Sequence, residues 1–224
     1  MKLSKRTRVI SILVFAVIGF ILMQIPVNQL EGSKATFTLF DAFAPMAGAI
    51  LGSIPGLVAV LVMQIANMLV HHSAAVDVGT FIRLLPMLGA VLYFAKPSSK
   101  WLLAIPALAI LSFNLDPVGR SVWYFSLFWL IPVVAHFSAK NNLFMRSLGA
   151  TFIAHSIGGA IWVHAFHLPK AVWVSLIPIV VAERLLFAIG ITLLYVAVSA
   201  LIPFLVRKRI LPQSALNFAP AFSL

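Results

Sequence analysis

Apolar residues fill long blocks of this chain, and short polar or charged stretches separate the blocks. Blocks of this length predict helices, because strands seldom exceed about 8 residues. We expect eight helices, over residues 8–26, 40–52, 55–71, 79–95, 101–114, 120–138, 146–166 and 172–206. The predicted fold class is an all-α, polytopic integral membrane helical bundle, with one membrane-embedded domain over residues 1–210 and a tail over residues 211–224.

One apolar segment, from Leu39 to Asn67, differs from an ordinary spanning helix. Its one charged residue, Asp41, lies near its start, and it is interrupted by two prolines and three glycines, at Pro45, Gly48, Gly52, Pro55 and Gly56. The sequence Ser53-Ile54-Pro55-Gly56 predicts a tight turn, because proline fits the first turn of the helix that follows. The arm before the turn, residues 40–52, would be about 20 Å long, which is shorter than a bilayer core of about 30 Å. Irregular backbone at that depth lies against protein or lines a cavity, so we expect a binding cavity here.

Composition supports a membrane location. Of 224 residues, 62% are hydrophobic and 9% are charged, and the mean hydropathy is +1.08, which no ordinary soluble domain reaches. The chain has no cysteine, which excludes disulfides, thiolate nucleophiles and zinc–thiolate sites. The first 30 residues resemble a signal peptide but lack a small-x-small cleavage site, so we expect a first spanning helix there.

The basic residues predict the topology. The formal net charge of +11 could indicate a nucleic-acid partner, but in so apolar a chain it indicates topological charge. With eight crossings both termini lie on one side, together with eleven of the 16 basic residues: Lys2, Lys5, Arg6, Arg8, Lys96, Lys100, Lys140, Arg146, Arg207, Lys208 and Arg209. Because Lys and Arg concentrate in cytoplasmic loops, we expect a multi-pass cell-membrane protein whose termini and tail are cytoplasmic and which binds no nucleic acid.

Polar side chains gather at the helix ends that this topology places on the outer side. The candidate substrate-binding residues are Asp41, Asn67, Thr80, Arg83, His155, Trp162, Glu183 and Arg184. Several have a structural alternative, since Asp41 can cap its helix, Arg83 can extend to the interface and Trp162 can belong to an aromatic belt. Glu183 and Arg184 are adjacent on a helix, so they point about 100° apart and need not pair. Ionisable groups at membrane depth are costly, which favours an ion-network or binding role for Glu183.

Histidines offer a second kind of chemistry. His155, Gly159 and Trp162 share one helix face, where the glycine allows either close helix packing or space for a ligand. His164 and His167 could share a metal, although no carboxylate is adjacent in the sequence. The chain has no phosphate loop, no nucleophile elbow and no HExxH motif, so we expect no catalytic site, no metal site and no cofactor.

Three segments, which cover roughly half the chain, carry a family resemblance: Leu39–Asn67, Val78–Pro86 and Ser175–Lys208. In this order they resemble the short second helix, turn and third helix, the start of the fourth helix, and the last helix of S components of energy-coupling factor (ECF) vitamin transporters, nearest to riboflavin-type members. The resemblance implies a six-helix core, to which residues 96–140 add an inserted helical pair. The first helix departs from the family's docking pattern of small residues, since it offers only Ser11, Ala16 and Gly19.

The resemblance implies a substrate-binding subunit that captures a vitamin-like small molecule at the outer face for ATP-driven uptake. Its implied partners are a transmembrane coupling subunit and two ATPase subunits, within the lipid bilayer. Two alternatives are a membrane-embedded enzyme that uses Glu183 with histidines, and a non-catalytic membrane scaffold. We also expect residues 30–40 to form a lid over the cavity.

Overall fold

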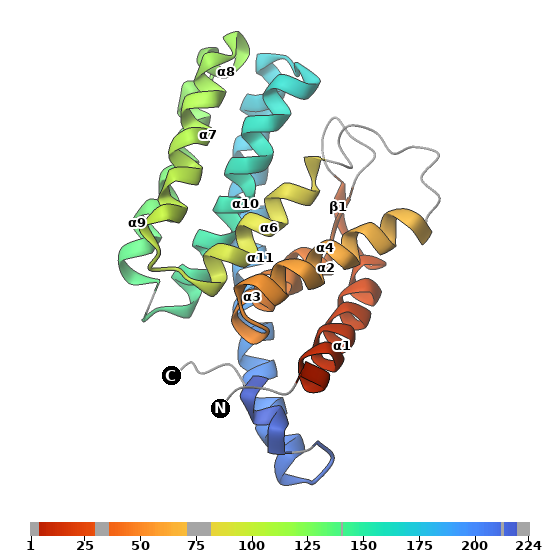
Figure 1. Ribbon diagram of the computed structural model, residues 1–224. Coiled ribbons are helices and arrows are strands. Elements are labelled where there is room, and N and C mark those ends of the chain that lie inside the picture. The colour runs from red at the N-terminus through yellow and green to blue at the C-terminus, as the bar shows by residue number, and fades with distance from the viewer. Residues whose placement is uncertain (1–4, 30–35, 71–81, 140, 212, 219–224) are drawn as a thin grey trace.

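Helices make up nearly all of the computed structural model, which describes residues 5–29, 36–70, 82–139, 141–211 and 213–218 (Figure 1). The α-helices are α1 (Lys5–Met23), α2 (Leu39–Phe43), α3 (Ala47–Ile50), α4 (Ser53–Val70), α6 (Leu84–Ala95), α7 (Ala104–Leu115), α8 (Pro117–Ser121), α9 (Ile131–Ser138), α10 (Leu143–Phe166) and α11 (Lys170–Arg207). The 3₁₀ helices are η1 (Ala44–Met46), η2 (Lys100–Leu103), η3 (Trp123–Leu130) and η4 (Gln213–Phe218). The strands are β1 (Pro26–Gln29) and β2 (Thr36–Thr38).

The helix–turn–helix expected around Pro55 is present, but the turn lies earlier than predicted. The first arm is made of α2, η1 and α3, and α4 already begins at Ser53. The chain reverses at Gly52, whose φ of 97° is a left-handed conformation that glycine adopts at little cost. Gly56 lets the two arms touch, since a Cβ there would lie 2.7 Å from the Ala47 backbone.

Two other predictions need correction. The first helix ends at Met23, and a two-stranded antiparallel hairpin follows it, so the all-α bundle carries one small sheet. A bulge between Pro26 and Asn28 shifts the hairpin register. The helix predicted over residues 120–138 is divided into α8, η3 and α9. Pro132, in the first turn of α9, has no N–H to continue a regular helix from η3.

Two clusters of buried side chains fill the bundle, and α10 contributes to both. The first cluster joins α1, α2, α4, α6 and α11, with Met46, Met63 and Phe94 among its largest side chains. The second joins α10 and α11 to the predicted inserted pair, and Phe113, Trp129 and Trp173 form its centre. In Figure 1 the pair formed by α7 and α9 stands against α10, on the side away from α1.

Among the described residues, two helices have the length and apolarity of membrane-spanning helices, α4 and α11. Their most apolar stretches are only 28% and 22% buried, whereas the core helix of a soluble protein is mostly buried. Five further apolar helical stretches are shorter, with 10–17 residues each. The start of α1 and the end of α11 lie at the same end of the bundle (Figure 1).

Candidate functional site

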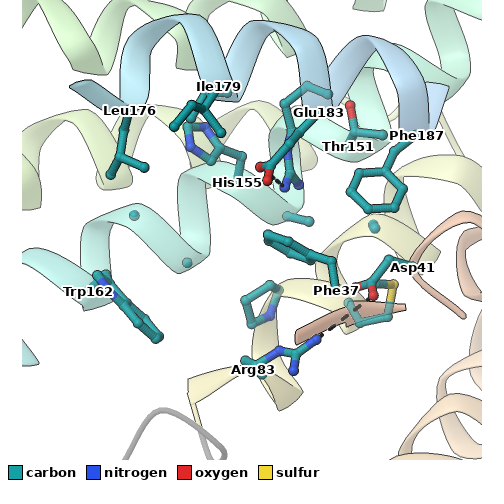
Figure 2. Close-up of a pocket in the computed structure, with 18 of the residues that line it drawn as sticks. Phe37, Asp41, Arg83, Thr151, His155, Trp162, Leu176, Ile179, Glu183 and Phe187 are labelled. Carbon is teal, nitrogen blue, oxygen red and sulfur yellow. Dashed lines mark hydrogen bonds and ion pairs between the residues drawn. The ribbon is translucent and has the colours of Figure 1, made fainter. Parts of the chain in front are cut away.

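A cavity of about 210 Å³ lies where the two buried clusters meet. A single water molecule needs only about 10–15 Å³ of such space, so the cavity has room for an organic molecule. Its wall combines side chains of β2, α2, η1, α6, η3, α10 and α11. Most of these are apolar or aromatic, and six are polar or charged: Asp41, Arg83, Thr151, His155, Glu183 and Arg184. Figure 2 shows the charged groups gathered at one end around Phe37.

The structure brings six of the eight candidate residues into this wall: Asp41, Arg83, His155, Trp162, Glu183 and Arg184. Asn67 is not among the lining residues, and its side-chain oxygen accepts a hydrogen bond from Gln24 Nε2 at 3.0 Å. Thr80 lies outside the described residues. The predicted lid is described only from residue 36, where β2 places Phe37 against the cavity.

Asp41 caps its helix and also forms an ion pair in the cavity wall. The backbone N–H of Thr38 donates to Asp41 Oδ2 at 2.7 Å, so the carboxylate caps α2. The same oxygen lies 3.8 Å from a guanidinium nitrogen of Arg83, which immediately precedes α6. Gln64 Nε2 donates to the backbone carbonyl of Arg83 at 3.3 Å and ties it to α4. Arg83 therefore belongs to an ion pair in the cavity wall, where the sequence also allowed an interfacial position.

Glu183 and Arg184 form the second ion pair, although neighbours on a helix need not meet. Glu183 Oε2 lies 3.4 Å from a guanidinium nitrogen of Arg184, because the long arginine side chain turns back toward its neighbour. Arg184 is only 5% exposed. Its guanidinium lies 4.8 Å from the ring centre of Phe37, and that of Arg83 lies 5.7 Å from the same ring. The Phe37 ring thus lies within cation–π distance of both guanidinium groups. Such contacts stabilise an arginine more strongly when it is shielded from water.

His155 is held by a residue from the predicted insertion. Trp129 Nε1 donates to His155 Nδ1 at 3.0 Å. An indole nitrogen can only donate, so Nδ1 is an acceptor and the neutral ring carries its proton on Nε2. Gly159, one turn along α10, makes room for this indole, since a Cβ there would lie 2.6 Å from Trp129 Cζ2. The His155–Gly159 spacing noted in the sequence therefore serves the packing of η3 against α10.

Other lining residues were not predicted as site residues, among them Phe125, Thr151 and Trp173. Trp173 is 2% exposed and packs edge-to-face on Phe125, with ring centres 5.0 Å apart. Its Nε1 has no hydrogen-bond partner among the described residues. The sequence offered little to separate Trp173 from aromatic-belt tryptophans, and Phe125 lies in the stretch interpreted as an insertion.

His164 and His167 lie away from the cavity wall. His164 Nε2 is 3.1 Å from Ser112 Oγ, and its Nδ1 is 3.8 Å from Asp116 Oδ2. The other oxygen of Asp116 accepts the backbone N–H groups of residues 118 and 119 and caps α8. These contacts fasten the corner between α7 and α8 to α10. In the part of the chain that is described, no three His, Cys, Asp or Glu side chains cluster as metal ligands would.

Comparison with known proteins gives one distant relative. The chain is 24% identical over 209 residues to an uncharacterized protein of Methanocaldococcus jannaschii, a match that covers 84% of this chain and 70% of that protein. No protein-family model and no solved structure matches the chain.

Proposed function

We propose that this protein crosses the membrane several times and binds a small organic molecule in the cavity, as the substrate-binding subunit of an ECF-type transporter. The observation that carries the proposal is the cavity itself. It is a largely apolar space that holds two ion pairs, and their Arg184 is one of two buried charged side chains among the described residues, the other being Asp116. Ligand sites commonly combine apolar walls with a few convergent polar groups.

The apolar exterior supports the membrane part of the proposal. On α11, Leu186 is 57% exposed and Leu193 is 64% exposed, and α1 exposes Leu13 and Val17 to a similar degree. Soluble monomers rarely expose apolar patches of this extent, whereas lipid-facing helices do. The cytoplasmic position of both termini follows from the distribution of basic residues.

The transport part of the proposal depends on the family resemblance, and the order of the elements supports it. A short first arm, a glycine turn and a longer helix follow one another, and a long last helix ends beside basic residues. The chain has no nucleotide-binding motif of its own. Energy for uptake would therefore come from two ATPase subunits through a transmembrane coupling subunit.

The test identifies the small molecule that stays bound to the protein during purification. The full chain is expressed, purified in mild detergent and extracted, and mass spectrometry compares the extract with that of two variants. Ala154→Phe places a large side chain in the cavity wall, whereas Ala165→Phe adds the same group at an exposed position of α10. We expect the wild type and Ala165→Phe to retain the same small molecule in about equimolar amount, and Ala154→Phe to lose most of it.

Two outcomes would contradict the proposal. Equal retention by Ala154→Phe and the wild type would place the molecule outside this cavity. Chemical conversion of the retained molecule on incubation would favour the membrane-embedded enzyme instead. The partners are tested separately, by asking whether a tagged protein isolated from membranes brings with it a second membrane subunit and two ATPases.

A further inference from the structure

The cavity wall has an excess of free hydrogen-bond donors. Trp173 Nε1 and Arg184 Nε are both buried and have no hydrogen-bond partner among the residues that the structure describes. His155 carries its proton on Nε2, and its one described hydrogen bond uses the other ring nitrogen. All three side chains line the cavity. A buried donor without a partner is costly, so a ligand that accepts from these groups relieves that cost on binding.

The two carboxylates in the wall already have cationic partners. Asp41 accepts from the Thr38 backbone and faces Arg83, and Glu183 faces Arg184. Thr151 donates its hydroxyl proton to the Leu148 carbonyl, so it can only accept from a ligand, and it is a neutral acceptor. A ligand ammonium group would therefore have to share a carboxylate with a guanidinium that is already paired with it.

Charge in the wall is balanced. The two carboxylates offset the two guanidinium groups, and His155 is neutral because its Nδ1 accepts from Trp129. A charged ligand would leave one unit of charge uncompensated in a site that is largely screened from water, which is unfavourable. An uncharged ligand preserves the balance.

The remaining wall is suited to a flat ring. Phe125, Trp162 and Trp173 contribute aromatic surfaces, and Gly158 and Gly159 add no side chains to the wall. Aromatic walls favour offset or edge-to-face contacts with a planar molecule.

On the basis of the proposed function, we propose that the cavity takes an uncharged planar aromatic or heteroaromatic molecule with at least two hydrogen-bond acceptors on its edge, such as carbonyl oxygens or ring nitrogens. Trp173, His155 and Arg184 are the residues that recognise this edge. The proposal assigns a specificity-determining role to Trp173, which was not predicted as a site residue from the sequence.

The experiment titrates the purified full-length protein with three fragments that share one ring: benzamide, benzoate and benzylamine. Ligand-observed NMR measures each Kd, and fragments of this size bind a suitable site with a Kd of about 1–10 mM. We expect benzamide, which is neutral and presents a carbonyl acceptor, to bind about tenfold more tightly than the cationic benzylamine, with the anionic benzoate between them. Absence of benzamide binding at about 10 mM, or benzylamine affinity equal to that of benzamide, would overturn the proposal.

A variant pair tests the assigned residue. Trp173→Phe keeps an aromatic ring but removes the N–H, so benzamide should bind about three- to tenfold more weakly while benzylamine is unaffected. Trp101→Phe makes the same change at a position that is 86% exposed, and should leave every Kd unchanged. Equal loss for all three fragments in Trp173→Phe would indicate a change of shape only and would contradict the recognition role. The order of the wild-type affinities needs no variant, so it tests the proposal even if Trp173→Phe does not fold.

The two proposals can fail separately. If the protein retains a natural small molecule that is a cation, the function stands and the assignment of ligand chemistry fails. If the fragments bind in the expected order but no natural molecule is retained from membranes or medium, the ligand chemistry stands and the transport proposal fails.

Discussion

Replacing Glu183 with glutamine is the sharpest test of the ionic part of the site. Glu183 lies 3.4 Å from Arg184, and the two side chains are 16% and 7% exposed. Glutamine keeps the size and one acceptor oxygen but removes the negative charge. Because Arg184 remains buried and charged, we expect the change to destabilise the ligand-free protein as well as to weaken ligand binding.

The magnitude follows from the distance. Two unit charges 3.4 Å apart attract with about 5 kcal/mol at the effective dielectric constant of about 20 that suits protein sites. A neutral hydrogen bond to glutamine recovers about 1 kcal/mol of this. Asp41 also attracts Arg184, and this attraction offsets part of the loss. Neutral glutamine also costs less to bury than charged glutamate, which reduces the loss again. We therefore expect a net loss of about 2–3 kcal/mol in the free energy of unfolding.

Thermal unfolding in detergent, followed by far-ultraviolet circular dichroism without ligand, measures the effect. For a chain of this size the melting temperature should fall by about 5–10 °C. A double variant, Glu183→Gln with Arg184→Gln, removes the stranded charge and should recover at least half of that loss. An unchanged melting temperature in the single variant would refute the reasoning. So would a double variant that is less stable than the single one.

Three further changes follow from the described geometry. Asp41→Asn should lower the free energy of unfolding by only about 1 kcal/mol in the same assay, since its ion pair is longer and more exposed; a loss as large as that of Glu183→Gln would contradict this. Gly159→Ala should lower the free energy of unfolding by about 1–3 kcal/mol, because its Cβ would lie 2.6 Å from an indole carbon of Trp129. In the control Gly158→Ala the new Cβ meets nothing closer than 3.6 Å, so this change should be neutral or stabilising. Equal melting temperatures of the two variants would refute the packing role. Single cysteines at the exposed positions Ser98 and Lys170 should label from inside and from outside the cell respectively, and labelling of both from one side would overturn the topology.

The helices could be predicted from the sequence because a long run of apolar residues is a local feature of the chain. Each of the eight apolar blocks contains helical residues in the described part of the chain. The charged site residues could also be predicted, since a charge in an apolar helix needs a partner, and partners gather where several helices meet. Asp41, Arg83, Glu183 and Arg184 line one cavity for this reason.

The inward faces of the helices could not be predicted in the same way. In α10 and α11 apolar residues occur all round the helix, so periodicity does not indicate which side faces the cavity. Trp173 was missed because any face of α11 could have been the lipid-facing one. The hairpin was missed because four and three residues are too short a pattern to predict strands.

The balanced charges of the cavity have a consequence for the work done by a membrane potential. Moving one elementary charge through 100 mV takes about 2.3 kcal/mol. Asp41 and Glu183 offset Arg83 and Arg184, and an uncharged ligand adds nothing to that sum. A loaded site of this kind could reorient between the two membrane faces without electrical work. Uptake into proteoliposomes that contain the complete transporter would then proceed at the same rate whether the voltage is clamped at zero or at a physiological value.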